Sequence, residues 1–475
     1  MKRILGILLV SLVGIGAAWA QDAGARLVGT WAGKLKTPGG ELRLVVKITA
    51  GADGTLTGTL DSLDQGATDI PVPKVVLDGN RVQLQMPMLR AQFTGTLNEK
   101  GDTLTGQFSQ GGANLPLVLT RTAAAPGLNR PQQPKPPFPY QVEPVVFDNP
   151  RAGVRLAGTL TYPNGRGPFP AVVLIAGSGP SDRDETLFGH KPFWVLADAL
   201  TRRGIAVLRY DKRGIGASTG DPATVTMEGY ADDALAGVEY LKKRMEVADP
   251  ARIGLIGHSE GGTVAPMVAN RSQDVSFVVL LAGDGVVGEQ LLLLQGAAIV
   301  KAMGGDDAAV AEQHAVQRAL FAILKQHPND ETARQKVHQY FTDRINALPE
   351  AQRQAMGDPE PYIQGQIASL VNPWMRHFLT YDPAAALRKL RVPVLALNGS
   401  KDMQVTPAEN LAAISSALKE SGTKDITVRE LPDLNHLFQT AETGSPQEYG
   451  QIEETFAPGA LQIIGDWIMA HTKKK

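Results

Sequence analysis

Five almost continuous apolar runs in the last two-thirds of the chain constrain its fold more than any other feature. These runs are residues 171–176, 205–210, 253–256, 277–281 and 394–397, and stretches with a helical pattern separate several of them. A run that does not alternate with polar residues is typical of a strand buried on both faces of a mostly parallel sheet. Alternation of such strands with helices predicts a three-layer α/β domain, with sites at the carboxyl ends of the strands.

The first part of the chain follows a different pattern. Short runs such as 42–48 and 81–86 alternate apolar and polar residues, and Gly, Asp, Asn and Pro turns separate them. Period-two alternation predicts strands with one buried face. We therefore expect residues 21–122 to form a small antiparallel β-barrel or sandwich.

This β-rich region offers little chemistry. It contains no histidine before Thr122, so a structural or recognition role is the simplest interpretation. Trp31, Met86 and Met88 could line a ligand cavity inside a barrel, although residues of these types are more often ordinary core.

Residues 123–140 contain six prolines and few apolar residues, which predicts an extended, semi-rigid linker. The α/β domain then spans 141–475. Its rhythm is broken at 284–382, where apolar residues recur at helical spacing and no buried-strand run occurs. Because this insertion lies between two sheet strands, we expect a helical cap that shapes a pocket and excludes water.

The first twenty residues read as a secretory signal peptide. Lys2 and Arg3 precede an apolar run over 4–16, and Ala18-Trp19-Ala20 forms a small-x-small cleavage site. A membrane anchor is the alternative, but the run is shorter than the roughly 20 residues that a span needs. The pattern predicts a mature start at Gln21 and a periplasmic or secreted protein.

Composition excludes several classes of function. The net charge of -1 gives no electrostatic reason to expect nucleic acid or an anionic membrane as a partner. The chain has no cysteine, so disulfides, thiolate nucleophiles and thiolate metal sites are impossible. Its eight histidines lack metal-binding spacing, and no Walker lysine follows Gly177-Ser178-Gly179. We expect no metal and no cofactor, and a small-molecule partner; the sequence does not give the oligomeric state.

The best nucleophile candidate is Ser259, in Gly257-His258-Ser259-Glu260-Gly261. The apolar run before it and the small residues around it are typical of a sharp strand-to-helix turn that exposes a serine hydroxyl. A serine is a poor nucleophile at neutral pH unless an imidazole takes its proton and a carboxylate orients that imidazole. The pattern therefore requires an acid and a histidine elsewhere.

Asp402 and His436 satisfy that requirement. Asp402 follows the apolar run at 394–397, and His436 follows the strand-like 426–431, so both are expected on loops at the carboxyl edge of the sheet. The chain order Ser, acid, His matches the order required. Asp433 is the nearest rival acid and is better interpreted as a turn residue.

An oxyanion hole needs backbone N–H groups aimed at the developing charge. The amide of Glu260, after the nucleophile, is one expected donor, and Ser178 is the other, with Gly179 next. Pro180 has no amide hydrogen. The Glu260 side chain could position water, bind an amine or pair with a nearby base. Charged residues at 182–184 and Lys212 and Arg213 are expected chiefly to fix loops through ion pairs.

Taken together, these motifs resemble the α/β-hydrolase superfamily. The set comprises 257–261, 177–184, 211–218, 398–402 and 434–436. Within it, the chain is similar to bacterial carboxylesterases with a β-rich domain ahead of the catalytic one, and more distantly to serine aminopeptidases and dienelactone hydrolases. The resemblance covers about 140–475 and implies the α/β-hydrolase fold and cleavage of carboxylic esters of short acyl chain.

The sequence predicts a serine hydrolase that acts by acyl transfer from Ser259. A serine aminopeptidase is an alternative, and it would need an acid such as Glu260, Asp284 or Glu289 to hold a free amino terminus. A thioesterase is a further alternative. A periplasmic binding protein with a degenerate hydrolase fold is the non-enzymatic one.

Overall fold

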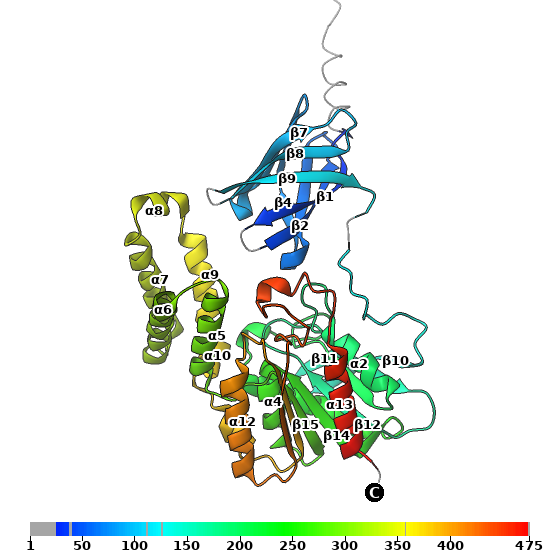
Figure 1. The fold of residues 1–475 in the computed structure, drawn as a ribbon. Coiled ribbons are helices and arrows are strands. Elements are labelled where there is room, and N and C mark those ends of the chain that lie inside the picture. The colour runs from blue at the N-terminus through cyan, green and yellow to red at the C-terminus, as the bar shows by residue number, and fades with distance from the viewer. Residues whose placement is uncertain (1–24, 38–39, 111–112, 125–126, 357, 474–475) are drawn as a thin grey trace, which may run out of the picture. The chain divides into compact units, whose positions relative to one another are not determined.

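The computed structural model describes residues 25–473, except for 38–39, 111–112, 125–126 and 357. The chain divides into two units, Met1–Leu128 and Asn129–Lys475, which are drawn in Figure 1. The expected signal peptide lies outside the described residues. Within those residues, every helix is too short or too polar to cross a membrane.

The first unit is one antiparallel sheet that curls into a nearly closed barrel. Its strands are β1 (Gly29–Thr37), β2 (Gly40–Ala50), β3 (Leu56–Ser62), β4 (Ala67–Val72), β5 (Lys74–Asp78), β6 (Arg81–Met86), β7 (Ala91–Leu97), β8 (Thr103–Gln110) and β9 (Ala113–Thr122). They hydrogen-bond in the order β4-β3-β2-β1-β9-β8-β7-β6-β5. Short 3-10 helices follow β3 (Leu63–Gln65) and β6 (Pro87–Leu89). The prediction of a barrel or sandwich is therefore resolved in favour of the barrel-like sheet.

Alternate side chains of the strands point into the barrel and form its core, which leaves a cavity of about 330 Å³ lined in part by Leu35, Leu44 and Phe108. In β6, Val82, Leu84 and Met86 are buried while their neighbours are less so, as the period-two pattern requires. Trp31 is fully buried, and its indole N–H donates to the Leu27 carbonyl at 2.8 Å. Met88 is 76% exposed, so it does not belong to the core.

The second unit is built on a mixed eight-stranded sheet. Its strands are β10 (Tyr140–Asn149), β11 (Val154–Pro163), β12 (Phe169–Ile175), β13 (Ala206–Tyr210), β14 (Ala248–His258), β15 (Val275–Leu281), β16 (Val394–Gly399) and β17 (Ile426–Leu431). They lie in the order β10-β11-β13-β12-β14-β15-β16-β17. The pairs from β13 to β17 are parallel, whereas β10 and β11 pair antiparallel. The five apolar runs lie on the parallel strands.

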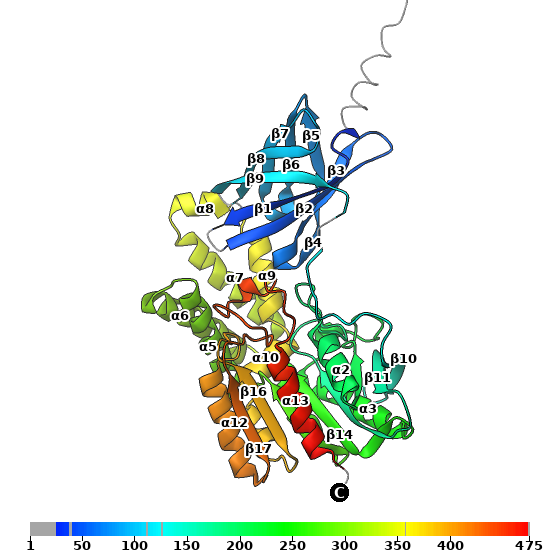
Figure 2. The ribbon, with the colours of Figure 1, turned by 45° about the vertical axis from the view of Figure 1, so that its right-hand side comes forward.

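Helices cover both faces of this sheet, which explains why its strands are apolar throughout. Helices α2 (Pro192–Arg202) and α13 (Pro458–His471) pack on one face, and α3 (Met227–Lys243), α4 (Glu260–Ala269) and α12 (Pro407–Ser421) pack on the other. Figure 2 shows α12 and α13 on either side of β16 and β17.

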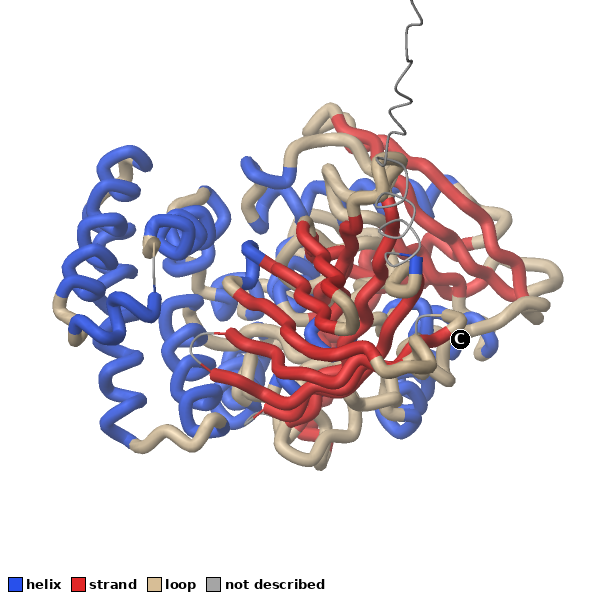
Figure 3. The backbone as a smooth tube through the Cα atoms, turned by 90° about the horizontal axis from the view of Figure 1, so that it is seen from above, coloured by secondary structure: helices blue, strands red, loops and turns tan. Residues whose placement is uncertain are grey.

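The insertion between β15 and β16 is helical, and Figure 3 shows a group of helices at one side of the molecule, away from the strands. It contains α5 (Gly288–Ala302), α6 (Asp307–Gln326), α7 (Asp330–Asn346), α8 (Glu350–Met356), α9 (Glu360–Leu370), α10 (Pro373–Thr380) and α11 (Pro383–Leu387). The helices from α6 to α10 share a small apolar core that includes Leu320, Phe321 and Ile363. We refer to 284–382, which ends directly before α11, as the cap.

The proline-rich stretch does not run free along its whole length. From Asn129 it belongs to the second unit, where the buried Arg130 donates to the carbonyls of Phe188, Gly450 and Ile452, each at 2.8 Å. Gln132 adds hydrogen bonds to the backbone of 455–456. These contacts hold two surface loops of the second unit together.

Candidate active site

Ser259 lies in a sharp turn between β14 and α4. Its backbone has φ 53° and ψ -121°, a conformation that costs a non-glycine residue of order 1–3 kcal/mol and persists only where the surroundings enforce it. The Ser259 amide donates to the Leu281 carbonyl of the neighbouring strand at 2.9 Å. The turn therefore exposes the serine side chain beyond the carboxyl end of the sheet.

The glycines that flank the serine are there because nothing larger fits. A Cβ at position 257 would lie 1.9 Å from the Gly261 carbonyl oxygen, and one at position 261 would lie 2.0 Å from the Ile175 carbonyl oxygen. Both contacts involve backbone that cannot move aside. The Gly-x-Ser-x-Gly pattern is thus required by the close packing of α4 against β14 and β12.

Asp402 and His436 form a buried acid–base pair. Nδ1 of His436 lies 2.8 Å from Oδ2 of Asp402, and both residues are buried. The other carboxylate oxygen, Oδ1, accepts the N–H groups of Gln404 and Val405 at 2.8 and 2.9 Å. Because an ionised carboxylate can only accept hydrogen bonds, the imidazole donates its Nδ1 proton to Asp402 and keeps Nε2 as a proton acceptor.

Ser259 and His436 line the same cavity, which measures about 260 Å³. We call it the small cavity. Its other lining residues are Gly177, Ser178, Pro180, Ser181, Glu185, Thr186, Leu187, His258, Gln404 and Leu437. The three residues expected from chain order therefore meet at one edge of the sheet: Ser259 and His436 at the cavity, and Asp402 behind the imidazole.

The rival residues lie elsewhere. The Asp433 side chain is 65% exposed and forms an ion pair with Lys401 at 2.9 Å. His190 is buried between Thr455 and the Tyr449 carbonyl, at 2.8 and 3.0 Å. Neither of the two lines the small cavity.

The expected oxyanion donors occupy three positions around the serine. Ser178 lines the small cavity, whereas Gly179 lines only the larger cavity beside it, and Glu260 is the first residue of α4. Among the described residues, the amides of Ser178 and Glu260 have no protein acceptor. Backbone N–H groups without a protein acceptor, such as that of Glu260 at a helix N-terminus, are of the kind that bind anions.

Glu185 and His258 form a second buried pair that sequence reasoning missed. His258 Nδ1 lies 2.9 Å from Glu185 Oε1, and its Nε2 lies 2.9 Å from the His436 carbonyl. Both neighbours accept hydrogen bonds, so both ring nitrogens carry hydrogen and the imidazole is charged. Burial lowers the pKa of His258, but the Glu185 carboxylate outweighs it and the pKa is raised overall. In the sequence, the one signal for the Glu185–His258 pair is the position of His258 directly before Ser259.

A larger cavity of about 620 Å³ lies between the sheet loops and the cap. We call it the cap cavity. It shares Ser178 and Pro180 with the small cavity, and Lys212, Tyr230 and Trp374 are among its other lining residues. Polar groups from the loops therefore face aromatic and apolar groups, including Trp374 from the cap.

The charged residues singled out in the sequence are mostly engaged in ion pairs. Arg183 pairs with Asp211 at 2.6 Å, and Lys191 pairs with Asp184 at 3.0 Å. The Glu260 carboxylate is buried and pairs with Lys212 at 2.8 Å, while its second oxygen accepts the indole N–H of Trp374. The expected loop-fixing ion pairs are therefore present.

Asp284 stands apart because it is a buried carboxyl without an ion pair among the described residues. It follows β15 and accepts a hydrogen bond from Thr263 Oγ1 at 3.0 Å. Burial, together with the negative charges of Glu260 and Asp402 and against the Thr263 hydrogen bond, raises the pKa of Asp284 to about 7. It lines neither cavity.

Comparisons with known proteins match most of the second unit. The sequence profile described as the alpha/beta hydrolase family matches residues 172–449. Esterase EstD of Thermotoga maritima is 31% identical over 356 residues, which cover 73% of this chain and 74% of that protein. The bifunctional esterase/perhydrolase DCH of Acinetobacter calcoaceticus is 28% identical over 260 residues, covering 51% of this chain and 83% of that protein.

Solved structures are more distant. An esterase of Pyrococcus furiosus overlaps 70% of this chain and 92% of its own at 15% identity, with a TM-score of 0.40. At that score the overlap adds nothing to what the sequence relatives show.

Proposed function

Because the chain belongs to the alpha/beta hydrolase family, we propose that it is a serine esterase that cleaves carboxylic esters through an acyl-enzyme on Ser259. As a carboxylesterase-like hydrolase it needs a nucleophile, a base and an oxyanion site. The observation that carries the proposal is the Asp402–His436 hydrogen bond of 2.8 Å behind a cavity that His436 shares with Ser259.

The reaction follows from the roles of these groups. His436 Nε2 takes the proton of the Ser259 hydroxyl as Oγ attacks the ester carbonyl, and the oxyanion lies against the amides of Glu260 and Ser178. The resulting imidazolium, held by Asp402, gives its proton to the leaving alcohol. Water, deprotonated by the same imidazole, then hydrolyses the acyl-enzyme and regenerates the serine. No step requires a cofactor.

Cavity sizes favour a short acyl group. The small cavity of about 260 Å³ has Leu187 and Leu437 in its lining, which suits a short alkyl chain. The cap cavity is more than twice as large, and we assign the alcohol portion of the ester to it. We therefore expect activity to fall as the acyl chain lengthens, and to tolerate larger alcohols.

The aminopeptidase alternative needs an unpaired acid in the pocket, but each of its three candidate acids already has an ion-pair or hydrogen-bond partner. Glu260 is paired with Lys212, Glu289 is paired with Lys325 at 2.6 Å, and Asp284 is held by Thr263. None of the three lines either cavity. An ester therefore suits this site better than a free amino terminus.

The test compares p-nitrophenyl butyrate with an aminoacyl p-nitroanilide and butyrylthiocholine, using the wild type and Ser259→Ala. We expect turnover of the p-nitrophenyl ester to be fastest and the variant to be inactive on it. A fluorophosphonate should label Ser259 in the wild type. Faster anilide or thioester turnover would overturn the substrate class, and an unlabelled Ser259 would point to a binding protein.

We also propose, from the first twenty residues alone, that the protein is exported to the periplasm or secreted. Expression of the full chain in a bacterial host followed by fractionation and N-terminal sequencing checks this. A product that starts at Gln21 outside the cytoplasm is expected, and a product retaining Met1 in the cytoplasm contradicts the proposal.

A further inference from the structure

Lys212 is a buried lysine at the edge of the cap cavity. Its Nζ donates to the Gly177 carbonyl at 2.5 Å and to Glu260 Oε2 at 2.8 Å, and it lies 4.2 Å from the centre of the Tyr230 ring. The Lys212 ammonium group therefore contacts a carboxylate, a backbone carbonyl and the face of an aromatic ring. It is therefore built into the loops that surround Ser259.

The carbonyl that Lys212 holds belongs to the peptide whose N–H is that of Ser178. In a trans peptide the C=O of one residue and the N–H of the next point in opposite directions. Lys212 fixes the Gly177 C=O, so it also fixes the direction of the Ser178 N–H. Glu185 accepts the Gly177 N–H at 2.6 Å, which leaves this part of the loop little freedom to rotate.

The partner of Lys212 supplies the other expected oxyanion donor. The backbone N–H of Glu260 directly follows Ser259 in the chain and is that donor. The side-chain carboxylate of the same residue accepts a hydrogen bond from Lys212. Glu260 is therefore connected to both expected donors. It carries one of the amides in its own backbone, and it acts on the Ser178 amide through Lys212 and the Gly177 carbonyl. The two oxyanion donors are linked by a single buried ion pair.

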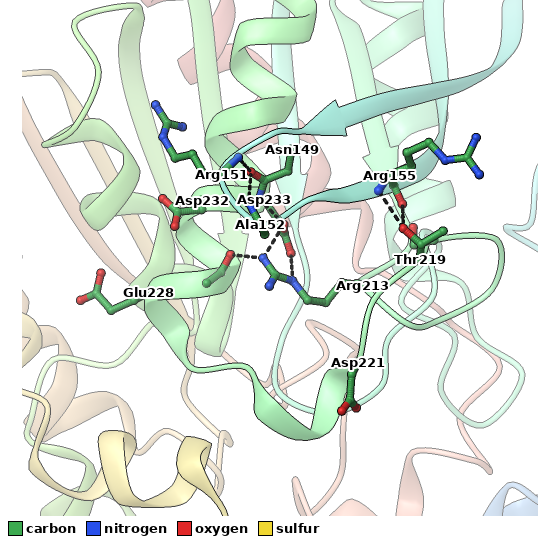
Figure 4. A network of polar contacts seen from close by, with 12 residues as sticks. Asn149, Arg151, Ala152, Arg155, Arg213, Thr219, Asp221, Glu228, Asp232 and Asp233 are labelled. Carbon is green, nitrogen blue, oxygen red and sulfur yellow. Dashed lines mark hydrogen bonds and ion pairs between the residues drawn. The ribbon is translucent and has the colours of Figure 1, made fainter.

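The loop that carries Lys212 is itself fixed on both sides. Asp211 pairs with Arg183 at 2.6 Å, and Arg213 donates to both carboxylate oxygens of Asp233 on α3 at 2.7 Å. Figure 4 shows Arg213 reaching Asp233, to which Asn149 also donates at 2.7 Å. The ammonium group of Lys212 is therefore presented from a rigid segment.

The cap is connected to the same ion pair. The indole N–H of Trp374, on α10, donates to Oε1 of Glu260. The Trp374 ring stacks on the Phe378 ring, and the two ring centroids are 4.9 Å apart. Trp374 and Lys212 both line the cap cavity, where we place the alcohol portion of the ester. The wall of that cavity therefore includes both residues that bind the Glu260 carboxylate.

We propose that the Lys212–Glu260 ion pair is a positioning device that aims the Ser178 amide into the oxyanion hole, and that Trp374 connects it to the cap. The proposal rests on the proposed esterase function. It assigns Lys212 and Glu260 to transition-state stabilisation, where the oxyanion forms, rather than to binding of the ground-state ester.

The main test replaces Lys212 by methionine, which keeps the length of the side chain and removes the charge. Losing one well-aimed oxyanion donor lowers kcat by about 10²- to 10³-fold, so we expect a fall in kcat of about 10²-fold with KM for p-nitrophenyl butyrate nearly unchanged. Lys191→Met is the matched control, because Lys191 is ion-paired to Asp184 nearby and does not touch Gly177. A wild-type kcat in Lys212→Met overturns the proposal.

Loss of one buried partner can also destabilise the fold. The double variant Lys212→Met/Glu260→Gln removes both charges and leaves an amide oxygen for Trp374. We expect it to regain most of the thermal stability lost in Lys212→Met while kcat stays low, and Lys212→Arg to recover part of kcat. If kcat returns together with stability in the double variant, the pair is merely structural and the proposal is wrong.

Trp374→Phe tests the connection to the cap, because it keeps the stacking on Phe378 and removes the N–H. We expect kcat to fall by about 10-fold, the cost of one hydrogen bond to a charged group. An unchanged kcat would remove the cap from the proposal.

Ser259→Ala separates the two hypotheses. If Ser259→Ala retains activity, the proposed function itself fails. If Ser259→Ala is inactive but Lys212→Met keeps the wild-type kcat, only the positioning role fails.

Discussion

The barrel and the hydrolase unit both bury the faces of β-sheets, but they differ in where they bury charge. In the described part of the barrel, the buried carboxylates are Asp61 and Asp64, and each pairs with a partly exposed base, Lys47 or Arg43. In the hydrolase unit, ion pairs in which both partners are buried lie just beyond the carboxyl ends of the parallel strands, as with Lys212 and Glu260.

Burying a charge costs several kcal/mol before its partner offsets the loss. A sheet that only has to be stable can avoid this cost, and the barrel interior does so with aliphatic and aromatic side chains. The hydrolase unit accepts the cost at one edge of its sheet, because chemistry there needs oriented charges in a low dielectric. The difference favours reactivity in the second unit and a scaffold or recognition role for the barrel, and the variants below test this division.

The largest expected effect is that of Ser259→Ala. Without the nucleophile, residual catalysis comes only from binding and the oxyanion site, so we expect kcat to fall by roughly 10⁵-fold. Steady-state kinetics with p-nitrophenyl butyrate measures it, and Ser109→Ala in the barrel is the control, with a wild-type rate expected. Comparable losses in the two variants would contradict the division between the units.

Asp402→Asn should be nearly as severe, with a loss in kcat of about 10³- to 10⁴-fold. Oδ1 accepts two backbone N–H groups, so the asparagine carbonyl takes that position and its NH₂ group faces His436 Nδ1. The imidazole then carries its proton on Nε2, where it cannot accept one from Ser259. Asp433→Asn, at the exposed rival acid, should keep the wild-type kcat, and the reverse ranking would make Asp433 the orienting acid.

Asp284 tests the cost of buried charge through stability. Its pKa is about 7 in the folded state and 3.8 in the reference state, so its contribution to stability is fully present below pH 4 and is lost as pH rises through 7. At about 1.4 kcal/mol per pKa unit, the loss is of order 4 kcal/mol. Asp284→Asn lacks this slope.

We therefore expect Asp284→Asn to match the wild type in urea denaturation at pH 4 and to exceed it in stability at pH 8. Folding free energies from urea titrations at several pH values measure the difference. Parallel pH curves for the two proteins would mean that the buried carboxyl carries no such cost.

Much of the site was predictable because α/β topology converts chain order into position. Ser259, Asp402 and His436 each follow an apolar or strand-like run, and the carboxyl ends of parallel strands share one edge of the sheet. The insertion 284–382 was likewise visible from a change in period. Such features depend on local pattern, and local pattern is what a sequence records directly.

The remainder depends on contacts between residues far apart in sequence. Lys212 could be expected to pair with some acid, but its partner Glu260 lies 48 positions away, and Trp374 is 114 positions from Glu260. Glu185 carries no motif at all. Similarly, a period-two pattern shows which face of a strand is buried but not whether the sheet closes on itself. The choice between a barrel and a sandwich therefore depends on the strand order, which only the structure supplies.

The smallest effect on catalysis is expected from the largest disruption of the barrel. Trp31 is fully buried, donates to the Leu27 carbonyl and lies 4.4 Å beneath the Arg121 guanidinium. Trp31→Ala should lower the unfolding free energy of the barrel by about 3–5 kcal/mol, since it leaves a cavity the size of an indole. Met88→Ala, at an exposed position on the same unit, should change it little.

If the barrel is a scaffold or recognition unit, kcat/KM of Trp31→Ala on p-nitrophenyl butyrate should equal that of the wild type at temperatures where the hydrolase unit is folded. Differential scanning calorimetry identifies the weakened transition, and kinetics on the same sample measures turnover. A loss of activity that follows the barrel transition would show that catalysis depends on both units. A normal rate on this small ester with a reduced rate on bulkier esters would instead make the barrel a recognition element.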